Sequence, residues 1–189
     1  MSDTQPKRSY PRTVGGLIGS LVVTAIAVLC YWGYQEWTRD VPLAEPEPVD
    51  YLARVAYLQE SGVTVAYPRT LPQGWIASSV QPQPGGDGVF GVGIHTDEGT
   101  FVGVYQDDDE LDDMLSTLVD EDAEQGDDAT VPTEVARTWT TWSDEGGDEA
   151  YAAELATPDG PQQLVVYGSA SDADIREVMS RLTTKPATP

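Results

Sequence analysis

An uncharged apolar segment near the N-terminus constrains this chain more than any other feature. From Val14 to Trp32, nineteen consecutive residues carry no charge. As an α-helix this segment would be about 28 Å long, which matches the hydrocarbon thickness of a bilayer, roughly 30 Å. Aromatic residues, which favour the headgroup zone, gather at its C-terminal end: Tyr31, Trp32, Tyr34 and Trp37. The sequence therefore predicts one transmembrane helix over residues 14–34.

The charges that flank this segment predict its orientation. Lys7, Arg8 and Arg12 precede it, whereas the residues that follow are of mixed charge. Because basic residues remain on the cytoplasmic side, residues 1–13 are expected in the cytoplasm and the remainder outside it. The expected location is thus the cell membrane, with a single pass and an extracytoplasmic C-terminal domain.

Other uses of the apolar segment are open. Ala25-Ile26-Ala27 offers an A-x-A signal-peptidase site, although cleavage there would leave apolar residues as a new N-terminus. Leu29 before Cys30 does not suit a lipoprotein signal. Gly15 and Gly19 form a small-residue pattern that pairs helices in some membranes, but a plain lipid-facing anchor is favoured.

The charge of the rest of the chain narrows the class of partner. Residues 1–40 have a net charge of +1, and residues 41–189 have one of −23 with only six basic residues. Such a surface repels phosphate, so nucleic-acid binding is disfavoured, while a basic partner or metal cations would be attracted. A solvated acidic surface is the simpler interpretation. Because Cys30 is the only cysteine, there is no intramolecular disulfide or thiolate metal site.

The chain divides into an anchor, a spacer and one domain. Residues 35–49, rich in proline and acid, are expected to be a semi-extended spacer. An extracytoplasmic α+β domain is expected over residues 50–184, followed by a tail at 185–189. Its first element is a short helix over 50–60, with apolar residues at Tyr51, Val55 and Leu58 and a stop at Gly62.

The rest of the domain is expected to contain a β-β-β-α pattern twice. Strands are expected over residues 75–80, 89–95 and 101–105, and again over 138–142, 151–155 and 164–167, with turn residues between them. Phe90, Ile94, Thr96 and Gly99 match Tyr151, Leu155, Thr157 and Gly160 at a constant offset of 61 residues. Coincidence between unrelated hairpins is the alternative to a true repeat.

A helix is expected after each set of strands. One apolar stripe contains Leu111, Met114, Leu115, Leu118 and Val119; the other contains Ile175, Val178, Met179 and Leu182. Acidic residues in each first turn suit the helix dipole, and an exposed acidic loop is expected over 120–130. Tight turns imply an antiparallel sheet. The predicted fold is therefore a two-layer α+β sandwich whose sheet is covered on one face by these two helices.

Residues that could carry chemistry do not form a known catalytic motif. His95 is the only histidine, and Ser78, Ser79 and Asp97 supply residue types for a triad without a recognisable spacing. Gly85-Gly86-Asp87-Gly88 and Gly91-x-Gly93 resemble a phosphate loop, but strands are expected on both sides, where a helix N-terminus would be needed. No catalytic or cofactor-binding residue is assigned.

Two further clusters have structural interpretations. Asp107, Asp108, Asp109, Asp112 and Asp113 lack the spacing that wraps calcium and are interpreted as a solvated helix start, so no metal ligand is assigned. The large rings favour a sheet core, while any that stay exposed could line a ligand groove: Trp75, Phe90, Tyr105, Trp139, Trp142 and Tyr151.

Several short motifs resemble a known family. They are Val49-Asp50-Tyr51, Leu71-Pro72-x-Gly74-Trp75, Gly93-Ile94-His95-Thr96, Gly103-Val104-Tyr105-Gln106 and a tryptophan at 142, behind the N-terminal anchor. Together they resemble the actinobacterial single-pass membrane proteins grouped as domain of unknown function 4245. The resemblance implies a cell-envelope setting and no assigned activity or functional residue.

Three function classes follow, in order of preference. The first is a non-enzymatic envelope module that binds a protein, peptide or wall component. The second is a divalent-cation sensor or buffer, suggested by the negative charge. The third, an enzyme with an unrecognised carboxylate or serine site, has the least support.

Overall fold

The computed structural model describes residues 47–82 and 88–187. The predicted cytoplasmic segment 1–13, the transmembrane helix 14–34, most of the spacer, the glycine turn at 85–87 and the last two residues of the tail lie outside the described residues. Within the described ranges, no helix combines the length and apolarity that crossing a membrane requires.

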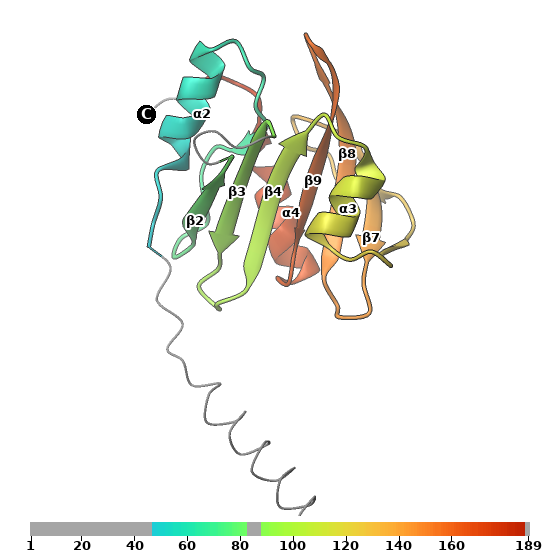
Figure 1. Ribbon diagram of the computed structural model, residues 1–189. Helices are drawn as coiled ribbons and strands as arrows, with labels where there is room; N and C mark the ends of the chain where they lie inside the picture. The colour runs from blue at the N-terminus through green and yellow to red at the C-terminus, as the bar shows by residue number, and fades with distance from the viewer. Residues whose placement is uncertain (1–46, 83–87, 188–189) are drawn as a thin grey trace, which may run out of the picture. The chain divides into compact units, whose positions relative to one another are not determined.

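An antiparallel sheet forms the centre of the domain (Figure 1). Its strand order is β2-β3-β4-β9-β8-β7-β5, and β6 also pairs with β7. The strands are β2 (Ile76–Gln81), β3 (Phe90–His95), β4 (Phe101–Asp107), β5 (Glu124–Gln125), β6 (Ala129–Thr130), β7 (Thr138–Ser143), β8 (Glu149–Thr157) and β9 (Gly160–Gly168). Sequence alone did not predict β5 and β6, because the acidic segment that contains them has no apolar alternation.

The two expected strand triplets are present as meanders, β2-β3-β4 and β7-β8-β9, which join where β4 pairs with β9. Matching positions face the same side of the sheet: Phe90 and Tyr151 both lie in the larger core, as do Ile94 and Leu155. The strand part of the predicted repeat therefore corresponds to the spatial arrangement.

The prediction that two helices cover one face was wrong. Met114 and Leu115 of α3 (Leu111–Leu118) pack with Ala150, Ala152 and Val165, which point to one side of the sheet. The buried side chains of α4 (Asp172–Ser180) pack on the other side, together with α2 (Tyr51–Glu60). Helices thus lie on both faces, with α3 in front of the sheet and α4 behind it in Figure 1. An apolar stripe shows that a helix packs, but not on which face.

The larger core lies on the face of the sheet toward α4. At the border of this core, the buried side-chain amide of Gln106 holds the segment that precedes β1. The Gln106 side chain is fully buried; it accepts a hydrogen bond from the Ala66 amide at 2.7 Å and donates to the Thr64 carbonyl at 2.7 Å. These bonds fix the segment that leads into β1 (Tyr67–Pro68), which pairs with β10 (Leu182–Thr183). Thr64 and Ala66 thus bond to a side chain where a strand would bond to a neighbouring strand.

Candidate functional site

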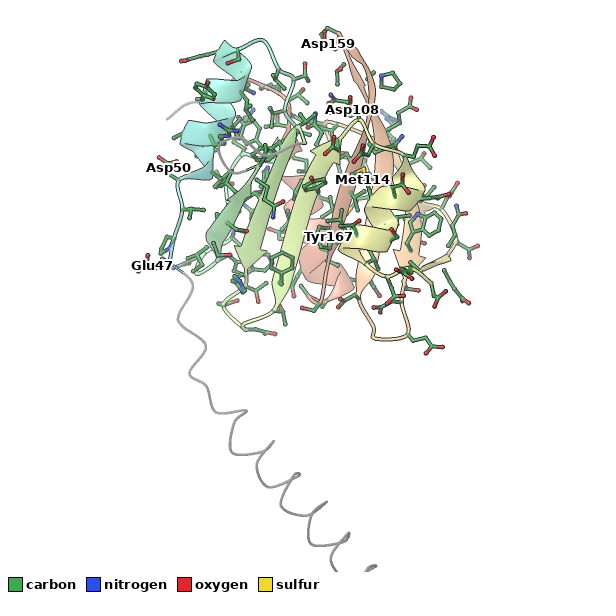
Figure 2. The ribbon with its side chains drawn as sticks, viewed as in Figure 1. Glu47, Asp50, Asp108, Met114, Asp159 and Tyr167 are labelled. Carbon is green, nitrogen blue, oxygen red and sulfur yellow. The ribbon has the colours of Figure 1, made fainter. Side chains whose placement is uncertain are left out.

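A groove opens on the α3 face of the sheet. Because α3 packs over β8 and β9, the adjoining part of the sheet is not covered by that helix (Figure 2). The resulting hollow has a volume of about 410 Å³ between α3 and strands β2, β3 and β4. Its floor and walls include Gly91, Gly93, Phe101, Tyr105 and Tyr167.

Glycines make the floor of the groove flat, and aromatic rings of the neighbouring strands occupy the space above them. A Cβ atom at Gly91 would lie 2.7 Å from Cδ2 of Tyr105, its partner across β3 and β4. A Cβ at Gly93 would lie 2.9 Å from Cε2 of Phe101. Rings that lie over glycines protect the exposed backbone, and they also present an aromatic surface to the groove.

The opposite wall is acidic. Asp113 and Thr117 lie one turn apart on α3, and Asp109 lies just before the helix; all three are exposed and line the groove. Met114 and Leu118 supply the apolar part of this wall. Within the described residues no basic side chain lines the groove.

Burial changes the titration of the ring hydroxyls. Desolvation raises the pKa of Tyr167, and it also raises the pKa of Tyr105, where the neighbouring Asp107 carboxylate adds to the effect. Both tyrosines are therefore neutral hydrogen-bonding groups at physiological pH. The groove combines neutral aromatic walls with an anionic rim.

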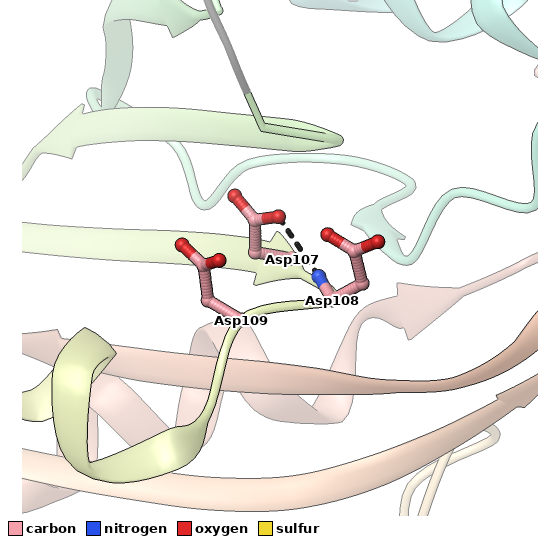
Figure 3. A group of neighbouring side chains, drawn as sticks. All are labelled: Asp107, Asp108 and Asp109. Carbon is pink, nitrogen blue, oxygen red and sulfur yellow. Dashed lines mark hydrogen bonds between the residues drawn. The ribbon is translucent and has the colours of Figure 1, made fainter.

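The aspartate cluster divides between structural and exposed positions (Figure 3). Asp107 is buried at the end of β4, and its carboxylate accepts a 2.8 Å hydrogen bond from the Asp108 amide. Its pKa is raised, chiefly by desolvation. Carboxylate oxygens of Asp107, Asp108 and Asp109 lie within 4.8 Å of one another. Three such groups supply about half of the six to eight oxygens that calcium takes.

The residue types of a triad are not brought together. The His95 ring packs edge-on against Phe101, with ring centroids 5.7 Å apart. The Asp97 carboxylate accepts a hydrogen bond from Trp75 Nε1 at 3.1 Å, and Ser78 donates to the Gly93 carbonyl. Among the described residues, no hydrogen bond joins His95 to a serine or to Asp97.

Some of the large aromatic rings pack in the core and others line the groove. Trp139, Phe90 and Tyr151 are buried in the core, and Trp139 Nε1 donates to the Val131 carbonyl at 3.1 Å. Tyr105 instead lines the groove. Sequence reasoning did not single out Phe101 and Tyr167 as groove residues. Glycines on the strands next to Phe101 and Tyr167 could have indicated these groove positions, but such a prediction requires the strand register, which the sequence does not give.

A protein family matches most of the chain. The model of the family described as "Protein of unknown function (DUF4245)" matches residues 10–182. No curated protein matches the chain.

Proposed function

The chain belongs to the DUF4245 family of proteins of unknown function, and from this premise we propose that it is a membrane-anchored, extracytoplasmic binding module of the cell envelope. In this proposal the α3 groove receives part of another envelope component. The apolar segment at 14–32 supports the anchor, and the charge of its flanks supports the orientation.

The groove itself is the observation that carries this proposal. It is concave, it is lined by three aromatic rings, and glycines in its floor leave room for two of these rings, Tyr105 and Phe101. Pockets that combine aromatic walls with a few placed polar groups are the usual form of a binding site. Because no catalytic arrangement accompanies the groove among the described residues, binding without chemistry is the function that the geometry supports best.

Site-specific photo-crosslinking in the full-length protein, in its own membrane, tests the proposal. A photoreactive phenylalanine analogue replaces Thr117, which lines the groove, or Ser116, which is exposed on the same helix but does not line it. A discrete adduct is expected from position 117 and not from position 116. Equal adduct patterns, or none at position 117, would contradict a groove ligand.

A second candidate is binding of a divalent cation, favoured by the three neighbouring carboxylates of Asp107, Asp108 and Asp109. It ranks second because Asp107 already accepts the Asp108 amide and has a raised pKa, which disfavours its charged form. Calorimetry with calcium and with magnesium tests it, with the Asp108→Asn, Asp109→Asn double variant as the comparison. Absence of heat at millimolar ion would remove this candidate.

A further inference from the structure

We propose that the groove binds a basic side chain, arginine or lysine, of an extended peptide segment that belongs to another envelope protein. This inference rests on the proposed function, since it names the chemistry of the ligand for the same groove. It commits to a cationic peptide and not to a saccharide or a metal ion. Three separate features of the groove support it.

The first feature is the absence of basic residues in and around α3. From Asp107 to Asp128, the segment that contains α3 has twelve acidic residues, and no lysine, arginine or histidine occurs between His95 and Arg137. Five of the six basic residues of the described chain are instead in or beside α2, α4 and the β1–β10 pair: Arg54, Arg69, Arg176, Arg181 and Lys185. The α3 face therefore attracts a cationic partner and orients it.

The second feature is the position of two carboxylates on the rim. Asp109 and Asp113 both line the groove, and neither forms an ion pair within the described residues. Their neighbours Asp108 and Asp112 are also exposed but do not line it. The negative charge at the groove therefore comes from Asp109 and Asp113, and its effect can be tested separately from that of the net charge of the domain.

The third feature is the set of rings over the glycine floor. The face of an aromatic ring attracts a guanidinium or ammonium group, most strongly when water is partly excluded. The Tyr105 ring lies over Gly91 and the Tyr167 ring over Gly103, each so close that a Cβ at the glycine would meet the ring. A guanidinium, which is planar and weakly hydrated, stacks on such rings while its stem covers apolar surface.

The size of the groove agrees with a single long side chain. A volume of about 410 Å³ lies within the usual range of small-ligand sites and has room for one arginine or lysine side chain. A protein partner would therefore place one arginine or lysine in the groove, while its backbone lies along the acidic rim formed by α3.

Titration of the full-length protein in uncharged detergent with the peptide acetyl-Gly-Arg-Gly-amide tests this inference. The isosteric citrulline peptide is the neutral control. Ring-carbon NMR signals of labelled tyrosine report contact at Tyr105 and Tyr167, and the Kd follows from their shifts. We expect the arginine peptide to move these signals and to bind at least about fivefold more tightly than its citrulline counterpart.

Two double variants separate the groove from general charge attraction. Asp109→Asn with Asp113→Asn should weaken the arginine peptide about fivefold, whereas Asp108→Asn with Asp112→Asn, which removes the same charge, should change the Kd by less than about twofold. Equal effects of the two variants, equal binding of the citrulline peptide, or tighter binding of a wall saccharide would each overturn the inference. Such a result together with a discrete adduct at position 117 would leave the binding function intact, whereas no adduct at all would contradict both.

Discussion

Gly103 and Tyr167 face each other across the β4–β9 pair, and a Cβ on Gly103 would lie 2.5 Å from Cε1 of the Tyr167 ring. The ring therefore occupies the volume that a side chain at position 103 would fill. This contact joins the two strand meanders at the centre of the sheet, on the face that carries the groove. Because Gly103 has no side chain, the Tyr167 ring can lie over it and form an aromatic wall of the groove.

Gly103→Ala should destabilise the protein and displace the Tyr167 ring. Because the added methyl meets a packed ring, we expect a loss of about 1–3 kcal/mol in the free energy of unfolding. Denaturant unfolding measures it. Tyr167→Leu removes the ring, so the alanine should cost much less in the double variant than in the single one. Independent, additive costs would show that the contact does not determine the preference for glycine.

The strands and helices were largely predictable because local patterns determine them. Alternation of apolar residues located β3, β4, β8 and β9, and the stripe at Leu111, Met114 and Leu115 located α3. The face on which α3 packs was not predictable, because it depends on Ala150 and Ala152 leaving room on one side of β8. The groove exists because α3 packs over β8 and β9 and leaves the neighbouring strands uncovered. Its residues are distributed over four strands and a helix, so no sequence motif contains them.

Gln106→Leu should lower the free energy of unfolding, although leucine is close to glutamine in size. The substitution leaves the Ala66 amide and the Thr64 carbonyl without the partner that now satisfies both, at 2.7 Å each. We expect a loss of about 2–4 kcal/mol, since buried unsatisfied groups retain their full desolvation cost. Hydrogen exchange should show faster exchange of the Ala66 amide.

Gln162→Leu is the matched control for this prediction. The Gln162 side chain is half-buried and accepts only the 2.5 Å hydrogen bond from Gln106 Nε2. Its replacement removes one of the three hydrogen bonds of the Gln106 side chain, so it should cost about 1 kcal/mol, clearly less than Gln106→Leu. A similar cost for both variants would mean that the edge segment does not depend on Gln106 in particular.

Ionisation of Tyr51 should lower the free energy of unfolding at alkaline pH. Its hydroxyl donates to the Pro68 carbonyl at 2.7 Å, and burial, with smaller contributions from Tyr67 and Asp50, raises the pKa of Tyr51 from 10.0 to about 12. Because the folded-state pKa is the higher one, the stabilisation is complete below pH 10 and is lost as the pH rises toward 12. The measurement is the free energy of unfolding as a function of pH.

Tyr51→Phe lacks this titration and provides the reference. The native protein should be more stable than the variant by about 1 kcal/mol below pH 10, and this advantage should shrink between pH 10 and pH 12. The other tyrosines are present in both proteins, so their titration cancels in the difference, except for the part of the Tyr67 titration that depends on Tyr51. A difference that stays constant over this range would contradict the raised pKa.

The proposed membrane orientation predicts which cysteines an impermeant maleimide can reach in intact cells. In a Cys30→Ala background, Asp159→Cys places a thiol at the exposed turn between β8 and β9 (Figure 2), and Ser2→Cys places one in the segment expected in the cytoplasm. Since an ionic reagent does not cross the bilayer, position 159 should be labelled in intact cells and position 2 only after permeabilisation. Label at position 2 on a polypeptide of unchanged length also excludes cleavage near Ala27. The reverse labelling pattern would put the acidic domain in the cytoplasm, and the proposed envelope partner with its basic side chain would then have no access to the groove.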